Sequence, residues 1–104
     1  MMGPQIAVLG AGSWGTALAL QLDRSGSRSI LWDRDSENLE QIQATRLNQR
    51  YLPGIDIPES IVVEIDILAA VKAADHVLVV TPSYAFASVM KTIREVLVPR
   101  QGVA

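Results

Sequence analysis

Three glycines early in the chain have a spacing that suits the binding of phosphate groups. Gly10, Gly12 and Gly15 form the pattern G-x-G-x-x-G. In a dinucleotide site the first glycine allows a tight turn, the second lets a pyrophosphate approach the backbone, and the third lets a helix pack close to a sheet. The start of that helix adds unpaired N–H groups and a positive dipole end. The pattern therefore predicts a nucleotide site, and the alternative is a glycine turn that binds no ligand.

Two charged residues, Asp33 and Arg34, follow an apolar segment that ends at Trp32. Asp33 lies 18 residues after Gly15, near the distance at which an acidic residue binds the adenosine ribose of NAD. Its charge would repel the 2′-phosphate of NADP, whereas an arginine beside it can pair with that phosphate. We therefore predict NAD or NADP as the cofactor. The alternatives are a solvated Arg34 and an Asp33 that only caps a turn.

These residues lie between segments that alternate between strand and helix patterns. Short apolar runs predict strands, and capped runs of good helix formers predict helices. The strands are expected at 6–9, 29–32, 61–65 and 77–80, with helices at 13–24, 36–46, 66–74 and 83–97, a loop at 48–60, and the first residues of a fifth strand at 103–104. The alternation predicts an α/β, Rossmann-like parallel sheet with strand order 3-2-1-4 and helices on both faces.

A ligand crevice is expected where this strand order reverses, between the first and fourth strands. It brings the loops 10–15 and 81–84 together. Pro82 ends the fourth strand there, and Ser83 is expected to cap the helix that follows. Tyr51 and Tyr84 are candidates to contact the nucleotide or merely to pack. His76 begins the fourth strand at the opposite end, so we interpret it as structural.

Composition excludes several classes of function. The chain has 104 residues, a length that suits one domain, and its net charge is −2. Without a run of basic residues, nucleic acid is not an expected partner. There is no cysteine and a single histidine, which argues against disulfides and metal sites and agrees with a reducing cytoplasm. No segment is apolar and long enough to predict membrane insertion.

The glycine spacing does not account for Ser13 and Trp14, but a family resemblance does. GAGSWGTALA, LWDRD, RYLPGIDIP and ADHVLVVTPSYA occur in this order from residue 10 onward. Together they resemble the N-terminal part of NAD(P)-dependent glycerol-3-phosphate dehydrogenase of the bacterial type. The resemblance implies cofactor contacts from Ser13, Trp14, Arg34 and Tyr51. Asp33 occupies a position where the family usually has a small residue, which leaves the preference for NADP in question.

The resemblance also implies that residues 1–104 are an incomplete nucleotide-binding domain. The helical substrate domain and the catalytic lysine would lie beyond Ala104, so the chain alone is expected to be inactive. The family interconverts glycerol 3-phosphate, a small phosphorylated substrate, and dihydroxyacetone phosphate in the cytoplasm for phospholipid synthesis. The alternatives are a free-standing NAD(P)-sensing module and another NAD(P)-dependent hydroxyacid dehydrogenase.

A sheet truncated at its fifth strand would leave residues 76–80 as an exposed apolar edge. Such edges promote association. We therefore expect the chain to form a homodimer through this edge, to rearrange its C-terminal part, or to be only marginally stable.

Overall fold

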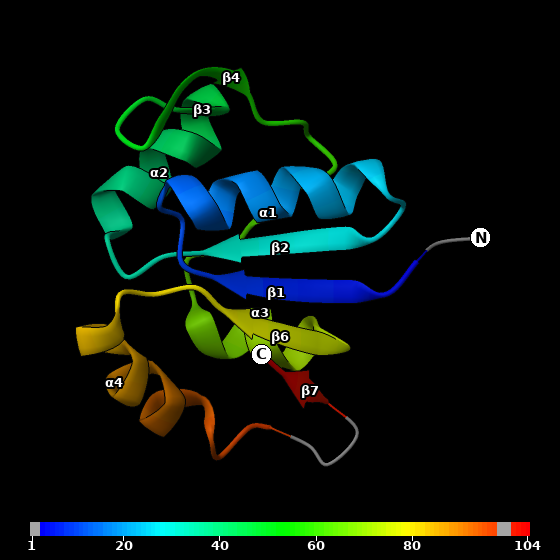
Figure 1. Ribbon diagram of the computed structural model, residues 1–104, viewed down its shortest axis with the longest axis vertical. Helices are drawn as coiled ribbons and strands as arrows, with labels where there is room; N and C mark the ends of the chain where they lie inside the picture. Colours follow the sequence, from blue (N-terminus) through cyan, green and yellow to red (C-terminus); the bar gives the residue numbers. More distant parts are fainter. Residues whose placement is uncertain (1–2, 98–100) are drawn as a thin grey trace.

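A computed structural model describes residues 3–97 and 101–104 of the chain (Figure 1). Its centre is a parallel sheet with the order β5-β2-β1-β6-β7. The strands are β1 (Gln5–Leu9), β2 (Arg28–Trp32), β5 (Val62–Val63), β6 (His76–Val79) and β7 (Gly102–Val103). The α/β, Rossmann-like class predicted from the sequence is confirmed.

Helices connect these strands and cover both faces of the sheet. They are α1 (Ser13–Arg24), α2 (Ser36–Thr45), α3 (Ile67–Ala73) and α4 (Ser83–Ile93). The chain moves from β1 outward to β2 and later returns from β5 to β6, on the other side of β1. Because such crossovers are right-handed, the two directions place α1 and α3 on opposite faces. In Figure 1, α3 passes behind β6, and α4 contacts α3.

Local sequence explains where these elements begin and end. Val8 and Leu9 of β1 are fully buried, as expected for a strand covered on both faces. The Asp35 and Asp66 side chains accept hydrogen bonds from the first-turn amides of α2 and α3, which satisfies donors that a helix leaves unpaired. Gly26, with φ of 94°, follows the end of α1, where a glycine readily adopts a left-handed conformation.

The segment expected to be a loop at residues 48–60 contains a second, two-stranded sheet. Here β3 (Leu47–Asn48) pairs antiparallel with β4 (Leu52–Asp56), with an irregular register. The prediction was wrong because Pro53 and Gly54 were taken as breakers. A two-stranded sheet consists only of edge strands, and an edge strand tolerates a proline.

The sheet contains the predicted order 3-2-1-4 as β5-β2-β1-β6 and extends it by a fifth strand, β7. β7 pairs with β6, and the backbone of Ala104 continues the ladder: Val79 N–H donates to its carbonyl at 2.6 Å and its N–H donates to Val77 at 2.9 Å. The expected exposed edge at residues 76–80 is therefore wrong, since β7 covers part of it. The homodimer remains a prediction, but the edge of β6 no longer supports it, because β7 is paired there.

Smaller differences concern element boundaries. The third strand is only β5, shorter than residues 61–65, and α2 ends before Arg46, which has φ of 58°. The N-cap residue of α4 is Pro82 and not the expected Ser83, and no side chain caps this helix. Because Ser83 is already the first residue of the helix, its side chain is not at the capping position. The sequence also predicts a break in the chain at Pro99, which lies outside the described residues. Within the described part of the chain, no helix is long and apolar enough to cross a bilayer.

Candidate functional site

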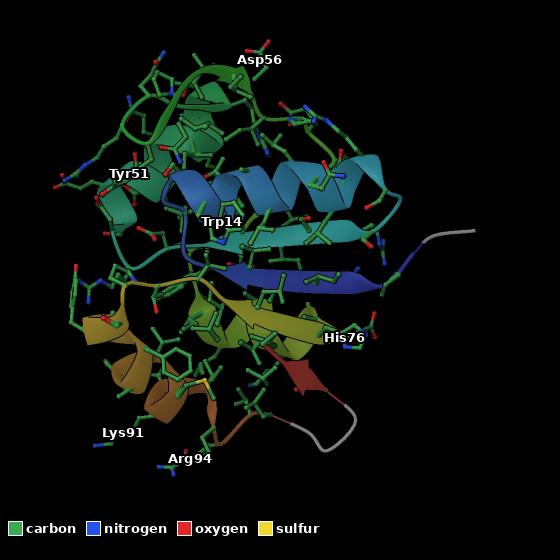
Figure 2. All side chains as sticks on the ribbon, in the orientation of Figure 1. Trp14, Tyr51, Asp56, His76, Lys91 and Arg94 are labelled. Carbon is green, nitrogen blue, oxygen red and sulfur yellow. The ribbon has the colours of Figure 1, made fainter. Side chains whose placement is uncertain are left out.

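A cleft of about 1120 Å³ opens at the carboxyl ends of β1, β2 and β6. The loops that follow these three strands form it, as the reversal of strand order predicts. Figure 2 shows Trp14 and Tyr51 toward this end of the sheet and His76 at the other end. All nine residues proposed from sequence to bind the cofactor line the cleft: Gly10, Gly12, Ser13, Trp14, Gly15, Asp33, Arg34, Tyr51 and Pro82.

The three glycines of the loop have different surroundings. Gly10 has φ of 135°, and a Cβ atom built on it would lie 2.6 Å from the Val80 carbonyl oxygen. A Cβ on Gly15 would overlap the carbonyl oxygen of Gly10. A Cβ on Gly12 would meet no atom within 4 Å, although Gly12 lines the cleft. Gly10 and Gly15 therefore hold the strand, loop and helix together, and Gly12 presents bare backbone to open space.

Helix α1 begins directly under this open space. Gly12 is its N-cap, and the first intrahelical bond runs from Thr16 N–H to the Gly12 carbonyl at 3.0 Å. No side chain caps this end, and the first turn contains no acidic residue. A 12-residue helix with an uncapped start presents free N–H groups and a partial positive charge, which suit an anion.

Trp14 is exposed at the mouth of the cleft. Its side chain is 68% exposed, so it does not cover the base of α1 as a core residue would. The other tryptophan, Trp32, is buried and donates its indole N–H to the Ile65 carbonyl at 3.0 Å. Large amphipathic rings that lie exposed beside a cleft are suited to contacts with a ligand or a partner surface.

The Asp33 carboxylate ties the end of β2 to the glycine loop. One oxygen accepts the Ala11 N–H at 2.8 Å, and the other accepts the Asp35 N–H at 3.0 Å. A carboxylate has about four acceptor positions, so Asp33 retains capacity for a ribose hydroxyl. Its bond to Asp35 is the turn cap given as the alternative to ribose binding, whereas its bond to Ala11 is a structural role that the sequence did not indicate.

Arg34 reaches across the cleft to the first turn of α4. Its guanidinium donates to the Tyr84 hydroxyl at 3.1 Å and lies 4.8 Å from the centre of the Tyr84 ring. Tyr84 is 75% exposed. Arg34 follows β2 and Tyr84 lies in α4, which follows β6, so the two residues come from opposite sides of β1 and their contact bridges the cleft.

Sequence reasoning missed two charged residues in the lining, Asp35 and Arg50. They form an ion pair of 2.9 Å, and the Arg50 guanidinium lies 5.3 Å from the ring centre of Tyr51. The position of Arg50 beside Tyr51 in RYLPG was the only available signal. Thr81, in the loop 81–84 that was expected at the crevice, also lines the cleft.

The cleft contains no lysine or histidine among the described residues that line it. Figure 2 places Lys91 on α4 and His76 on β6, both away from Trp14. The residues present can bind an anionic, planar ligand through backbone N–H groups, guanidinium groups and aromatic rings.

Comparisons with known proteins agree with this geometry. The curated glycerol-3-phosphate dehydrogenase (NAD(P)+) of Stenotrophomonas maltophilia is 47% identical over 100 residues, which are 96% of this chain and 29% of that relative. The corresponding protein of Xanthomonas euvesicatoria is 48% identical over 100 residues. The chain thus spans 29% of the length of the curated relatives it matches.

A solved structure supports the same relationship. The crystal structure of glycerol-3-phosphate dehydrogenase from Coxiella burnetii matches with a TM-score of 0.92 and 38% identity, over 97% of this chain and 31% of that one. The family model described as the NAD-dependent glycerol-3-phosphate dehydrogenase N-terminus matches residues 5–104. The chain therefore belongs to the family of NAD-dependent glycerol-3-phosphate dehydrogenase N-terminal domains.

Proposed function

We propose that this chain is the nucleotide-binding part of an enzyme that interconverts sn-glycerol 3-phosphate and dihydroxyacetone phosphate with NAD(P)(H). One observation carries the proposal: the backbone at Gly12 faces open space at the start of α1, while Gly10 and Gly15 are tightly packed. This is the arrangement that a pyrophosphate requires. Family membership supports the identity of the ligand and the reaction.

The residues of the cleft fit a dinucleotide. The free N–H groups of the first turn of α1 and the Ser13 hydroxyl suit the phosphates. Arg34 suits a 2′-phosphate or the face of an adenine ring, and Asp33 retains acceptor positions for ribose hydroxyls. The full proposed set comprises Gly10, Gly12, Ser13, Trp14, Gly15, Asp33, Arg34, Tyr51 and Pro82.

The nicotinamide group would supply the hydride chemistry, and the protein would bind and orient it. Reduction of a ketone also needs a proton donor near the carbonyl oxygen. The described lining of the cleft has no lysine or histidine, and the relatives are much longer than this chain. We therefore place the donor and the substrate site in a C-terminal domain, and we expect this chain to bind nucleotide without turnover.

The cofactor preference is proposed as dual, NAD or NADP. Asp33 disfavours a 2′-phosphate through its charge, whereas the adjacent Arg34 offsets that charge. Arg50 is paired with Asp35. We place the whole enzyme in the cytoplasm, in the synthesis of the glycerophospholipid backbone. The proposed partners are the nucleotide, a small phosphorylated substrate and a possible second copy of the chain.

Titration calorimetry with NADH and NADPH tests the proposal. The wild-type chain should bind both nucleotides. Gly12→Val should abolish binding of both, because its side chain would fill the space over the α1 amides. Gln21→Val, an exposed position on the same helix, should bind like the wild type. A wild-type chain that binds neither nucleotide, or a Gly12→Val variant that binds normally, would overturn the assignment.

A further inference from the structure

The peptide groups of Ala11 are held from both sides by side chains of other elements. Ala11 lies between Gly10 and Gly12 and is fully buried. Asp33 accepts its N–H. Its carbonyl accepts the Asn48 amide at 2.8 Å and the Thr16 hydroxyl at 3.2 Å. The backbone at the centre of the glycine loop thus has no freedom to reorient without breaking these bonds.

Asn48 is the centre of this polar cluster. It is 1% exposed, as is Thr16. Its amide nitrogen also donates to the Thr16 hydroxyl at 2.9 Å, and its oxygen accepts the Asn38 amide at 3.3 Å. These residues come from β3, α1 and α2, and Asn48 is 37 positions from Ala11 along the chain. Side chains from β3 and α1 thus bond to the Ala11 carbonyl, and Asn38 of α2 holds the Asn48 side chain in place.

Burying these polar groups is unfavourable unless each finds a partner. In this cluster the Thr16 hydroxyl accepts one bond and donates another, and both ends of the Asn48 amide are used. A satisfied network of this kind is rigid and specifies one arrangement. Glycine-rich loops otherwise have large conformational freedom, and a site that is ordered before binding has a smaller entropic penalty on association.

From these contacts we infer that Asn48 and Thr16 are positioning residues for the nucleotide. They fix the Ala11 peptide, and through it the backbone of Gly12 and the start of α1. The inference rests on the proposed nucleotide-binding function. Neither side chain lines the cleft, so both act through the backbone and not by touching the ligand.

The test compares Thr16→Val, which has the same shape without the hydroxyl, with Thr16→Ser, which keeps it. Ser29→Ala is the matched control, because Ser29 is also fully buried and donates to a backbone carbonyl, that of Ala19, outside the cleft. Thr16→Val should weaken NADH binding about tenfold, because it removes the two hydrogen bonds of the Thr16 hydroxyl from a buried network. Thr16→Ser should stay near the wild type, and Ser29→Ala should lower the melting temperature without changing affinity.

Hydrogen exchange of the Ala11 amide in the free chain gives a second readout. Thr16→Val and Asn48→Ala should accelerate this exchange at least tenfold more than Ser29→Ala does. If Thr16→Val binds like the wild type and leaves the exchange of Ala11 unchanged, or if Ser29→Ala reproduces both effects, the inference is wrong. If the wild type binds no nucleotide, the proposed function fails, and the exchange rates still decide whether these residues hold the loop.

Discussion

The wall of the cleft that follows β2 carries charges and hydrogen bonds, whereas the wall that follows β6 is nearly uncharged. The first wall contains Asp33, Arg34 and Asp35, which bond to backbone amides, to Tyr84 and to Arg50. The second contains Val79, Val80, Thr81, Pro82 and Tyr84. Since charge is confined to one side, electrostatic attraction can orient a ligand that carries its charge at one end. On the other side, the ligand must be recognised by its shape.

Removing Asp33 should have the largest effect. This residue belongs to the wall after β2, which we call the charged wall, and its hydrogen bonds also stabilise the fold. Asp33→Ala leaves the amides of Ala11 and Asp35 without their acceptor, so we expect a loss of about 3 kcal/mol in the free energy of unfolding. Denaturant titration measures this loss. Asp56→Ala, at an exposed position on β4, is the control. Equal losses of stability in the two variants would mean that the hydrogen bonds of Asp33 do not stabilise the fold.

Arg34→Gln should separate the two nucleotides. The loss of a guanidinium charge should weaken NADPH binding about tenfold and NADH binding about twofold, because only NADPH carries a 2′-phosphate for it to pair with. Calorimetry of both ligands gives the ratio. Arg24→Gln, at the exposed end of α1, should change neither affinity. Equal weakening of NADH and NADPH would show that Arg34 does not select for the phosphate.

Tyr84→Leu should act on the uncharged wall and therefore treat the two nucleotides alike. The variant loses an aromatic ring that lines the cleft while Arg34 keeps its charge, and we expect both affinities to fall about threefold. Phe86→Leu, an exposed aromatic on the same helix outside the cleft, provides the comparison for binding. A change in the ratio of NADH to NADPH affinity would contradict the contrast between the walls.

Arg50→Gln should have the smallest effect. It breaks the ion pair with Asp35, but the Arg50 side chain is 64% exposed, and exposed pairs contribute about 0.5 kcal/mol or less. Thermal and denaturant unfolding should therefore be nearly unchanged. A loss larger than about 1 kcal/mol would mean that Arg50 supports the charged wall as Asp33 does.

The parts of the fold and site that could be predicted are those that local sequence encodes. The glycine spacing indicated the turn and the open backbone at Gly12, and alternating segments indicated a parallel sheet with its crevice beside β1. Asp33 and Arg34 were placed in that crevice because they directly follow a strand. In each case the signal and the structure it specifies are a few residues apart.

The missed features depend on contacts between distant residues. Asn48 in a polar segment has no pattern that distinguishes it from a solvated loop residue, yet it is buried against Ala11. Pro53 and Gly54 are residues that usually break strands, so they predicted a loop where β3 and β4 form a hairpin. The fifth strand itself was expected at 103–104 and lies at Gly102–Val103, but its pairing with β6 was not foreseen, because that pairing joins residues far apart in the chain.

The contrasting surroundings of the two tryptophans have a spectroscopic consequence. Trp32 is 9% exposed and Trp14 is 68% exposed, so the first should emit at shorter wavelength and the second should be accessible to iodide quenching. A reduced nicotinamide absorbs where tryptophan emits, and a nucleotide bound beside Trp14 should quench that residue strongly. Trp14→Phe and Trp32→Phe would then divide one emission spectrum into a signal for occupancy of the cleft and a signal for integrity of the sheet.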